Sequence, residues 1–188
     1  MDYINLGGKI IATGDAGTPV DNGAFRYGYG LFETMLVQQG AIRLWQYHHE
    51  RLFDGLRQLY FDIPSLFTPE YLHGEVMRVV GRNKAEGLCR VRLQCYAEGG
   101  GLYSNGSRQP SFVIECFPLH EDDLLLNENG LVAGIAEGLN KSTDTLANLK
   151  SCNALIYAIA ARQAKDNRWN DALAVSYTHL TLPTILLV

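Results

Sequence analysis

Four stretches of the chain have the residue pattern of β-strands, and in the third of them, residues 88–98, hydrophobic and polar residues alternate with a two-residue period. The first and second stretches each contain a glycine-bearing turn, so each predicts a hairpin. The third and fourth are separated by a glycine-rich loop, and we expect them to pair with each other. The predicted strands lie within residues 3–13, 32–46, 88–98 and 110–119.

Two further segments follow the period of a helix. From Tyr47 apolar residues recur every three or four positions, and Pro64 marks a stop for this helix. Thr68 and Pro69 then predict the N-cap and the first position of a second helix. Two helices against an antiparallel sheet form an α+β layer, so we expect an N-terminal two-layer α/β domain over residues 1–120.

A second pattern begins at residue 121. An acidic connector leads to a strand, a polar loop, an Ala-rich helix and the start of a buried strand at Asp171. We expect residues 121–176 to be the incomplete start of a C-terminal domain. Residues 172–188 contain no Asp, Glu, Lys or Arg, and the last of them resemble translated vector readthrough. Residues 177–188 are therefore expected to be a non-native tail, the alternative being a genuine buried C-terminal strand.

Charge and composition argue against several classes of partner. The formal net charge is −4, so a phosphate-backbone partner is not expected. The N-terminus lacks a basic segment followed by an apolar one, and no apolar run reaches the ~20 residues of a membrane helix. The four cysteines show no CxxC pair and no metal-like spacing with histidine, which favours reduced thiols. These features predict a cytoplasmic enzyme or binding domain with no metal, nucleic-acid partner or membrane partner.

Lys150 is the lysine that the pattern favours for chemistry. Three of the five lysines, Lys9, Lys84 and Lys165, are expected to be solvated. Lys150 instead lies between apolar residues, just ahead of a predicted helix N-terminus. The positive helix end and partial burial both favour the neutral amine, which is the form that a Schiff-base lysine needs. Position alone leaves a solvated lysine as an equal alternative.

Arg51 is the second candidate, because a guanidinium is suited to a bidentate contact with an anion such as phosphate. A solvated helix arginine is the simpler interpretation of the same residue. His48 and His49 diverge by about 100° on a helix, so a shared metal ion is not expected. A thiol enzyme that uses Cys152 stays open on these grounds, although no local motif supports it.

Residues 26–34 predict a turn followed by a strand. Gly28 and Gly30 in this turn allow a backbone to approach a ligand closely. The third glycine and the following helix of a dinucleotide-binding fingerprint are missing, so that function is not expected.

Four short stretches, in this order, are similar to motifs of the class IV aminotransferase family, the fold-type-IV enzymes that use pyridoxal 5′-phosphate. They are YGYGLFET, HHERL, LKSCNAL and NDALAV, and the likeness covers residues 2 to about 176. The family includes branched-chain aminotransferases, D-amino acid aminotransferases and 4-amino-4-deoxychorismate lyases. The resemblance implies an α+β, D-amino acid aminotransferase-like fold whose second domain is truncated.

On this resemblance, Lys150 is the catalytic lysine that forms the Schiff base with the cofactor and shuttles the α-proton of the substrate. Arg51 binds the cofactor phosphate, and Phe32 and Glu33 line the substrate or cofactor pocket. The implied function is transfer of an amino group between an amino acid and a 2-oxo acid, by a homodimer of the full-length parent. The alternatives are a 4-amino-4-deoxychorismate lyase of the folate pathway and an inactive fragment. Ala154 stands where branched-chain enzymes usually place a tyrosine.

Overall fold

The computed structural model describes residues 2–17, 19–99 and 106–176, and it divides the chain into two compact units. The first unit contains Met1–Leu125 together with the short segment Lys150–Asn153. The second unit contains Leu126–Leu149 and the chain from Ala154 onward. Residues 150–153 therefore pack with a unit from which they are distant in sequence. The predicted divisions at residues 120 and 176 stay predictions, and the proposed tail lies outside the described residues.

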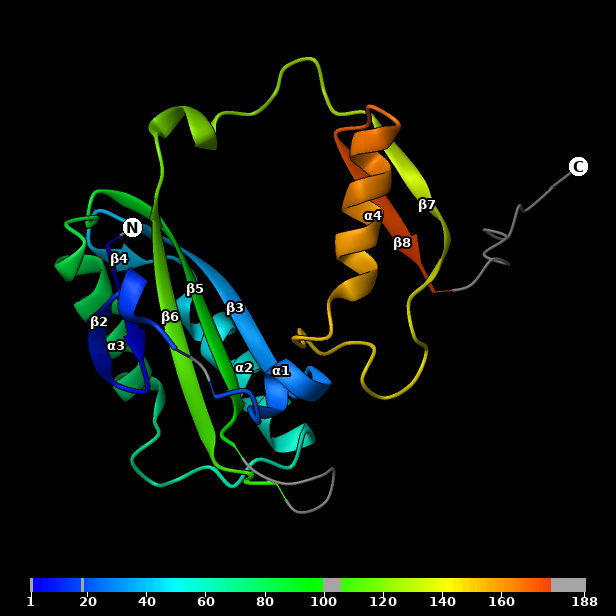
Figure 1. Cartoon of the computed structure of the whole chain (residues 1–188). Coiled ribbons are helices and arrows are strands. Elements are labelled where there is room, and N and C mark those ends of the chain that lie inside the picture. Colours follow the sequence, from blue (N-terminus) through cyan, green and yellow to red (C-terminus); the bar gives the residue numbers. More distant parts are fainter. Residues whose placement is uncertain (1, 18, 100–105, 177–188) are drawn as a thin grey trace, which may run out of the picture. The chain divides into compact units, whose positions relative to one another are not determined.

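The first unit is built on a six-stranded antiparallel sheet with the strand order β2-β1-β6-β5-β3-β4 (Figure 1). Both predicted hairpins are present, and the third and fourth stretches pair along their whole length, as expected. The strands are β1 (Tyr3–Leu6), β2 (Lys9–Ala12), β3 (Gly30–Gln38), β4 (Ala41–Ile42), β5 (Leu88–Ala97) and β6 (Pro110–Pro118).

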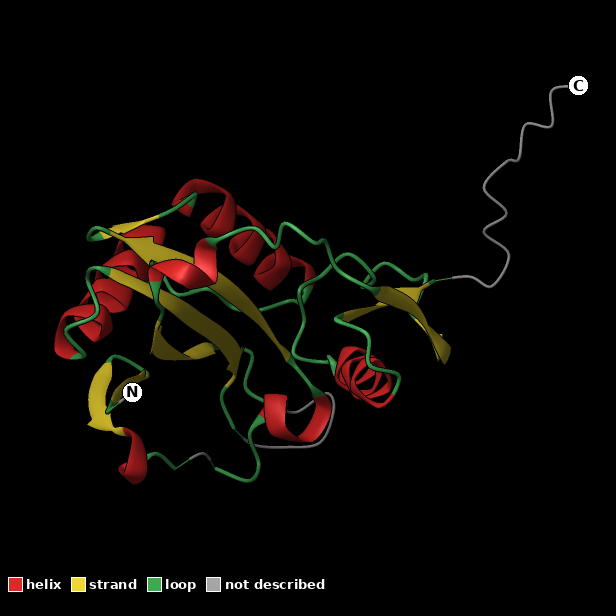
Figure 2. Cartoon of the chain, turned by 90° about the horizontal axis from the view of Figure 1, so that it is seen from above, coloured by secondary structure: helices red, strands yellow, loops and turns green. Residues whose placement is uncertain are grey.

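Helices α2 (Trp45–Gln58) and α3 (Pro69–Arg82) lie together on one side of this sheet (Figure 2). The first begins at Trp45, so Trp45 and Gln46 are helical and not part of the predicted strand, and it ends at Gln58, before the predicted stop at Pro64. The start of α3 is as predicted, because the Thr68 hydroxyl accepts a hydrogen bond from the backbone N–H of Tyr71 at 3.1 Å. The predicted α+β class and two-layer arrangement are thereby confirmed.

Short helices occupy connections that the pattern left as turns or loops. The helix α1 (Gly23–Tyr27) follows Asn22, whose side chain accepts hydrogen bonds from two backbone N–H groups of its first turn. Two 3-10 turns, η1 (Thr13–Asp15) and η2 (Glu121–Leu124), complete the first unit. An Asn followed by a glycine and two apolar or aromatic residues was the signal for α1 in the sequence.

The two faces of the sheet differ in burial, and this difference positions the candidate site. On β3 the residues from Glu33 to Val37 at odd positions are buried against the helices, whereas Phe32 and Thr34 are only half-buried. The same alternation runs along β5, where Arg92 and Gln94 are half-buried between buried neighbours. The helix-facing side thus forms the core, and the other side presents mixed polar and aromatic groups.

The second unit consists of β7 (Ala133–Asn140), α4 (Leu155–Asp166) and β8 (Asp171–Val175), with the two strands parallel. The Trp169 ring packs directly on Gly134, at a place where any side chain would collide with it. The expectation that the strand at Asp171 is buried is wrong for the described chain, since Leu173 is 59% exposed. β8 pairs with β7 and packs against α4, which leaves its remaining surface uncovered.

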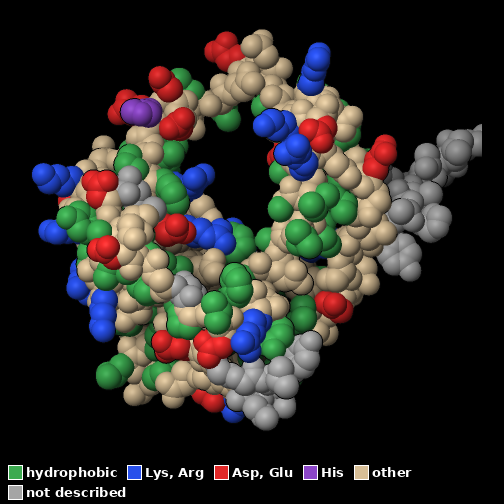
Figure 3. All heavy atoms as spheres, in the orientation of Figure 1, with side chains coloured by type: hydrophobic (Ala, Val, Ile, Leu, Met, Phe, Trp, Pro, Cys, Tyr) green, Lys and Arg blue, Asp and Glu red, His purple; other side chains and the backbone are tan. Residues whose placement is uncertain are grey.

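No helix among the described residues is both long and apolar enough to cross a lipid bilayer. The space-filling view shows acidic and basic side chains interspersed on the visible face of the first unit (Figure 3). Such mixing is typical of an ordinary hydrated protein surface.

Candidate active site

The segment that carries Lys150 is held against β3 by backbone hydrogen bonds. The N–H of Phe32 donates to the carbonyl of Lys150 at 2.9 Å, and the N–H of Cys152 donates to the carbonyl of Gly30 at 2.8 Å. Between these bonds, Leu31 and Ser151 form an antiparallel bridge. The segment therefore pairs with β3 as an additional short strand and fixes Lys150 beside the start of β3.

The arrangement of strands explains why this position is available. β4 pairs only with Val37 and Gln38, at the far end of β3. At Gly30–Phe32 the backbone N–H and C=O groups of β3 on that edge have no partner in β4. They form hydrogen bonds with residues 150–152 instead. Two parts of the chain that are far apart in sequence thus meet through main-chain bonding.

Two glycines make room for this segment. At Gly28, where φ is +66°, an added Cβ would lie 3.1 Å from the Cβ of Asn153. At Gly30 an added Cβ would lie 2.5 Å from the carbonyl oxygen of Cys95 and 3.1 Å from the sulfur of Cys152. The close backbone approach that the glycines predict is present, but the approaching group is the chain's own segment at residues 152 and 153.

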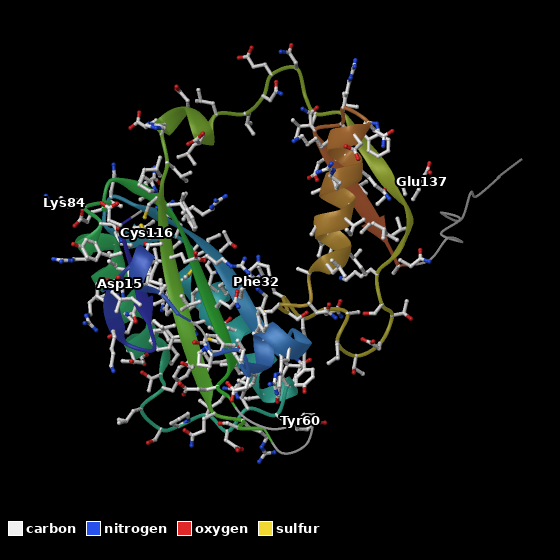
Figure 4. The ribbon with its side chains drawn as sticks, viewed as in Figure 1. Asp15, Phe32, Tyr60, Lys84, Cys116 and Glu137 are labelled. Atoms are coloured by element: carbon white, nitrogen blue, oxygen red, sulfur yellow. The ribbon has the colours of Figure 1, made fainter. Side chains whose placement is uncertain are left out.

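Two positively charged side chains, Arg92 and Lys150, lie close to the Phe32 ring. The guanidinium carbon of Arg92 lies 3.8 Å from the ring centroid, and the Nζ of Lys150 lies 5.1 Å from it. Phe32 lies on the side of the sheet that faces the viewer in Figure 4. Within the described ranges, neither Arg92 nor Lys150 belongs to an ion pair, and Arg92 donates instead to the amide oxygen of Gln94 at 3.1 Å. Glu115 on β6 is the cross-strand neighbour of Arg92 but forms no ion pair with it, so the two cations beside Phe32 outweigh this one carboxylate and favour an anion.

Arg92 was missed by the sequence reasoning. The signal was present, because strict alternation in the stretch around it places Arg92 and Gln94 on one face of the strand. The register of β3 against β5 pairs Thr34 with Arg92 and Phe32 with Gln94, so the arginine reaches the ring diagonally. That register could not be read from β5 alone.

Arg51 forms a bidentate ion pair with Glu33. Its Nε donates to Oε1 at 2.7 Å, and its Nη2 donates to Oε2 at 2.5 Å. The Nδ1 of His48 lies 2.8 Å from Oε2, and because a carboxylate only accepts, this nitrogen carries the proton. The hydrogen bonds to Glu33 raise the pKa of Arg51 above its ordinary value. Glu33 is 1% exposed, so the pair neutralises a buried carboxylate.

The predicted site residues therefore meet β3 from two sides. Successive side chains of a strand point to opposite faces, so Phe32 and Glu33 diverge. Lys150 accompanies Phe32 on one face, and Arg51 contacts Glu33 on the helix-facing side. The structure does not place Phe32 and Glu33 in one shared wall of a pocket, and the cofactor roles of all four residues stay predictions.

A pocket of roughly 330 Å³ opens on the same face of the sheet as Arg92. Its polar lining includes Arg92, Gln94, Asn22, the Tyr96 side chain and the thiol of Cys152, and most of its apolar lining comes from β1, β6 and α1. Burial raises the pKa of the Cys152 thiol to about 11, although Arg92 partly opposes the shift. A thiol with so high a pKa is a poor nucleophile near pH 7, which disfavours a thiol enzyme that uses Cys152.

The other lysines and histidines have ordinary surroundings. Lys9, Lys84 and Lys165 are exposed as predicted, and Lys84 lies at the periphery in Figure 4. His48 binds Glu33 while the ring of His49 packs on Trp45, with ring centroids 5.4 Å apart. In the described part of the chain no group of three or more His, Cys, Asp or Glu side chains is placed to hold a metal ion.

Comparison with known proteins identifies the family of the chain. The family model for amino-transferase class IV matches residues 30–179, which include both β3 and the Lys150 segment. The chain belongs to the class IV aminotransferase family.

Three relatives illustrate the likeness. An aminodeoxychorismate lyase of Vibrio harveyi is 23% identical over 168 residues, covering 89% of this chain and 60% of that protein. A branched-chain aminotransferase from Thermoproteus uzoniensis, solved with norvaline, matches at a TM-score of 0.78 with 20% identity, over 93% of this chain and 59% of that one. A branched-chain amino acid aminotransferase from Escherichia coli matches at a TM-score of 0.75 with 19% identity, over 93% of this chain and 58% of that one.

These matches confirm the expected fold type IV architecture. The chain spans about three fifths of the length of the relatives it matches.

Proposed function

We propose that this chain belongs to a pyridoxal-phosphate-dependent enzyme that transfers an amino group between an amino acid and a 2-oxo acid. The observation that carries the proposal is the backbone pairing that holds Lys150 beside Phe32 at the start of β3. A lysine fixed by main-chain bonds, in a family whose members use this cofactor, is suited to hold an aldehyde at its Nζ.

Two residues carry groups of the kind that the cofactor needs, and they reach β3 from opposite faces. Lys150 supplies an amine for the aldehyde, and Arg51 supplies a guanidinium whose side chain is 50% exposed for the phosphate. Bound pyridoxal phosphate supplies an electron sink for chemistry at the substrate α-carbon. The Nζ of Lys150 would accept the α-proton and return it, while Arg92 would attract the substrate carboxylate.

Reductive labelling tests this assignment. The chain is incubated with pyridoxal phosphate and reduced with borohydride, and the modified peptides are mapped by mass spectrometry. We expect label at Lys150, complete loss in Lys150→Ala, and retention in the matched control Lys141→Ala, which changes another half-buried lysine of the same loop. Label spread over Lys9, Lys84 and Lys165, or none, would contradict a working lysine site.

A 4-amino-4-deoxychorismate lyase is the second candidate function. It is supported by the likeness to the Vibrio harveyi protein and by the two cations at Phe32, which suit a substrate with several carboxylates. Release of pyruvate from aminodeoxychorismate would favour the lyase, and formation of an amino acid from a 2-oxo acid would favour the transferase. Neither product, despite labelling at Lys150, would favour the third candidate, an inactive fragment, which the partial coverage of the relatives supports.

We also infer a homodimeric parent enzyme in the cytoplasm. The cytoplasmic location is supported by four free thiols, three of them buried. Sedimentation of the full-length parent would test the dimer, and a monomer with full activity would exclude it.

A further inference from the structure

The guanidinium of Arg51 has two hydrogen-bonding edges, and only one of them is used by the protein. Its Nε and Nη2 are both taken by Glu33, with the closest contacts at 2.5 and 2.7 Å. Its Nη1 has no hydrogen bond among the described residues, and half of the side chain is exposed. One edge therefore faces the protein, and the other is free to bind an anion.

The ion pair between Glu33 and Arg51 is costly to break. Its side chain is 2% exposed, and both carboxylate oxygens are used: Oε1 by Arg51, and Oε2 by Arg51 and His48 together. Rotation of Arg51 away from Glu33 would leave a buried carboxylate without its cation, which is strongly unfavourable. The planar fork also fixes the plane of the guanidinium, so the direction of Nη1 is set by Glu33.

We propose that Glu33 is a positioning residue for Arg51: it orients the free Nη1 edge toward the cofactor phosphate and does not itself line the pocket. This inference rests on the proposed function, because it takes the phosphate of pyridoxal phosphate as the anion that Arg51 binds. His48 supports the same arrangement by donating its Nδ1–H to Oε2. A preorganised donor binds a phosphate without first losing side-chain entropy, whereas a freely rotating arginine does not.

The chain contains a matched control for this geometry. Glu75 is likewise buried, at 6% exposure, and it also pairs with a half-exposed arginine on α3, Arg78, with the shorter N–O distance at 2.6 Å. The amide of Asn5 also donates to Glu75. Glu75 thus shares the burial and pairing of Glu33 but lies away from Lys150, on the helix that carries no candidate site residue.

The experiment compares affinity for pyridoxal phosphate with affinity for pyridoxal, which lacks the phosphate. Dissociation constants of both are measured by absorbance for the wild-type chain and for Glu33→Gln, Glu75→Gln and Arg51→Met. We expect Glu33→Gln to reduce the preference for the phosphorylated form about tenfold, because the free edge of Arg51 is no longer held in one orientation, while affinity for pyridoxal stays unchanged. Glu75→Gln should keep the wild-type preference, even if its thermal stability falls.

Two outcomes separate failure of this inference from failure of the proposed function. A wild-type preference in Glu33→Gln, combined with a lost preference in Arg51→Met, overturns the positioning role and leaves the phosphate contact intact. No preference in the wild-type chain, or full preference in Arg51→Met, overturns both. A second measurement needs no cofactor: NMR measures the rate at which the Arg51 Nε–H exchanges with solvent. This exchange should be slow in the wild type, where the Nε–H donates to Glu33, and fast in Glu33→Gln. Equal exchange in the two proteins would also overturn the proposal.

Discussion

Gly30 and Cys152 lie so close that the first has no room for a side chain. The N–H of Cys152 donates to the Gly30 carbonyl at 2.8 Å, and a Cβ on Gly30 would lie 3.1 Å from the Cys152 sulfur. The lysine of the proposed site thus depends on a glycine at the start of a strand, which binds no ligand itself.

Gly30→Ala is expected to destabilise the fold and displace the lysine segment. The new Cβ would also lie 2.5 Å from the backbone carbonyl of Cys95, which cannot move as a side chain can. We expect a loss of about 1–3 kcal/mol in the free energy of unfolding, as in other overpacked sites. Urea denaturation measures this loss, and pyridoxyl labelling of Lys150 should fall with it.

Gly74→Ala provides the control, because Gly74 lies inside α3 with nothing within 4 Å of its added Cβ. That substitution should instead stabilise the helix by up to about 1 kcal/mol. Equal stability changes at Gly30 and Gly74 would exclude the crowding explanation.

Arg92→Gln should weaken the binding of carboxylates to the positive site at Phe32. The substitution keeps a polar side chain but removes one of the two cations beside the ring. We expect affinity for a 2-oxo acid to fall about tenfold, in line with loss of one charge-assisted hydrogen bond. Calorimetric titration of the pyridoxal-phosphate-loaded chain with pyruvate would measure it.

Arg90→Gln is the matched comparison, since Arg90 also lies over an aromatic ring, that of Phe117, at 5.2 Å from its centroid. It is exposed and belongs to the same strand. If Arg90→Gln lowers affinity as much as Arg92→Gln does, the effect is one of general surface charge.

Alkylation of Cys152 should be slow at neutral pH and should accelerate with alkali. Only the thiolate reacts, and the pKa of this thiol is raised to about 11. The iodoacetamide rate at Cys152 should therefore increase roughly tenfold per pH unit from pH 7 to 10, whereas an ordinary cysteine levels off near its pKa of about 8.5. Peptide mass spectrometry at each pH gives the rate. A plateau at pH 9 would mean that the thiol is not buried as described.

Stability should fall as pH rises above about 8.5, the ordinary cysteine pKa. A thiol whose pKa is raised by folding keeps its proton in the native state but loses it first in the unfolded state. Its contribution to stability is complete below the unfolded pKa and is lost as pH approaches the folded value, about 11 for Cys152. Burial also raises the pKa of Cys95, so both thiols act in the same direction. Urea midpoints at pH 7, 9 and 10 should decline, and Cys152→Ala should decline less steeply.

Local patterns predicted the first unit well because each element carries its own signal. Short β-forming runs around glycine turns and the alternation in residues 88–98 indicate the strands, and Thr68 with Pro69 specifies the start of α3. The fold class follows from those elements alone, since two helices must cover one face of an antiparallel sheet. Exposure of β8 was not predictable in this way, because burial of a strand depends on which elements cover it and not on its own residues.

The site was predictable in part. Lys150 and Arg51 were singled out by position and by family resemblance, and the structure gives each a defined neighbour in Phe32 and Glu33. The division of Phe32 and Glu33 between two faces follows from strand geometry and was readable in the sequence. The attachment of residues 150–152 to β3 was not, because it depends on a long-range backbone pairing that leaves no local pattern.

That attachment has a consequence for solubility as well as for chemistry. The unpaired N–H and C=O groups of an outer strand are a template for aggregation, and proteins usually blunt them. Here residues 150–152 bond to the exposed side of β3 at Gly30 and Phe32 and so shield it from other chains. A change that releases the lysine segment therefore has two effects. It displaces the amine of Lys150, and it exposes unpaired backbone N–H and C=O groups of β3 to which other copies of the protein can bind.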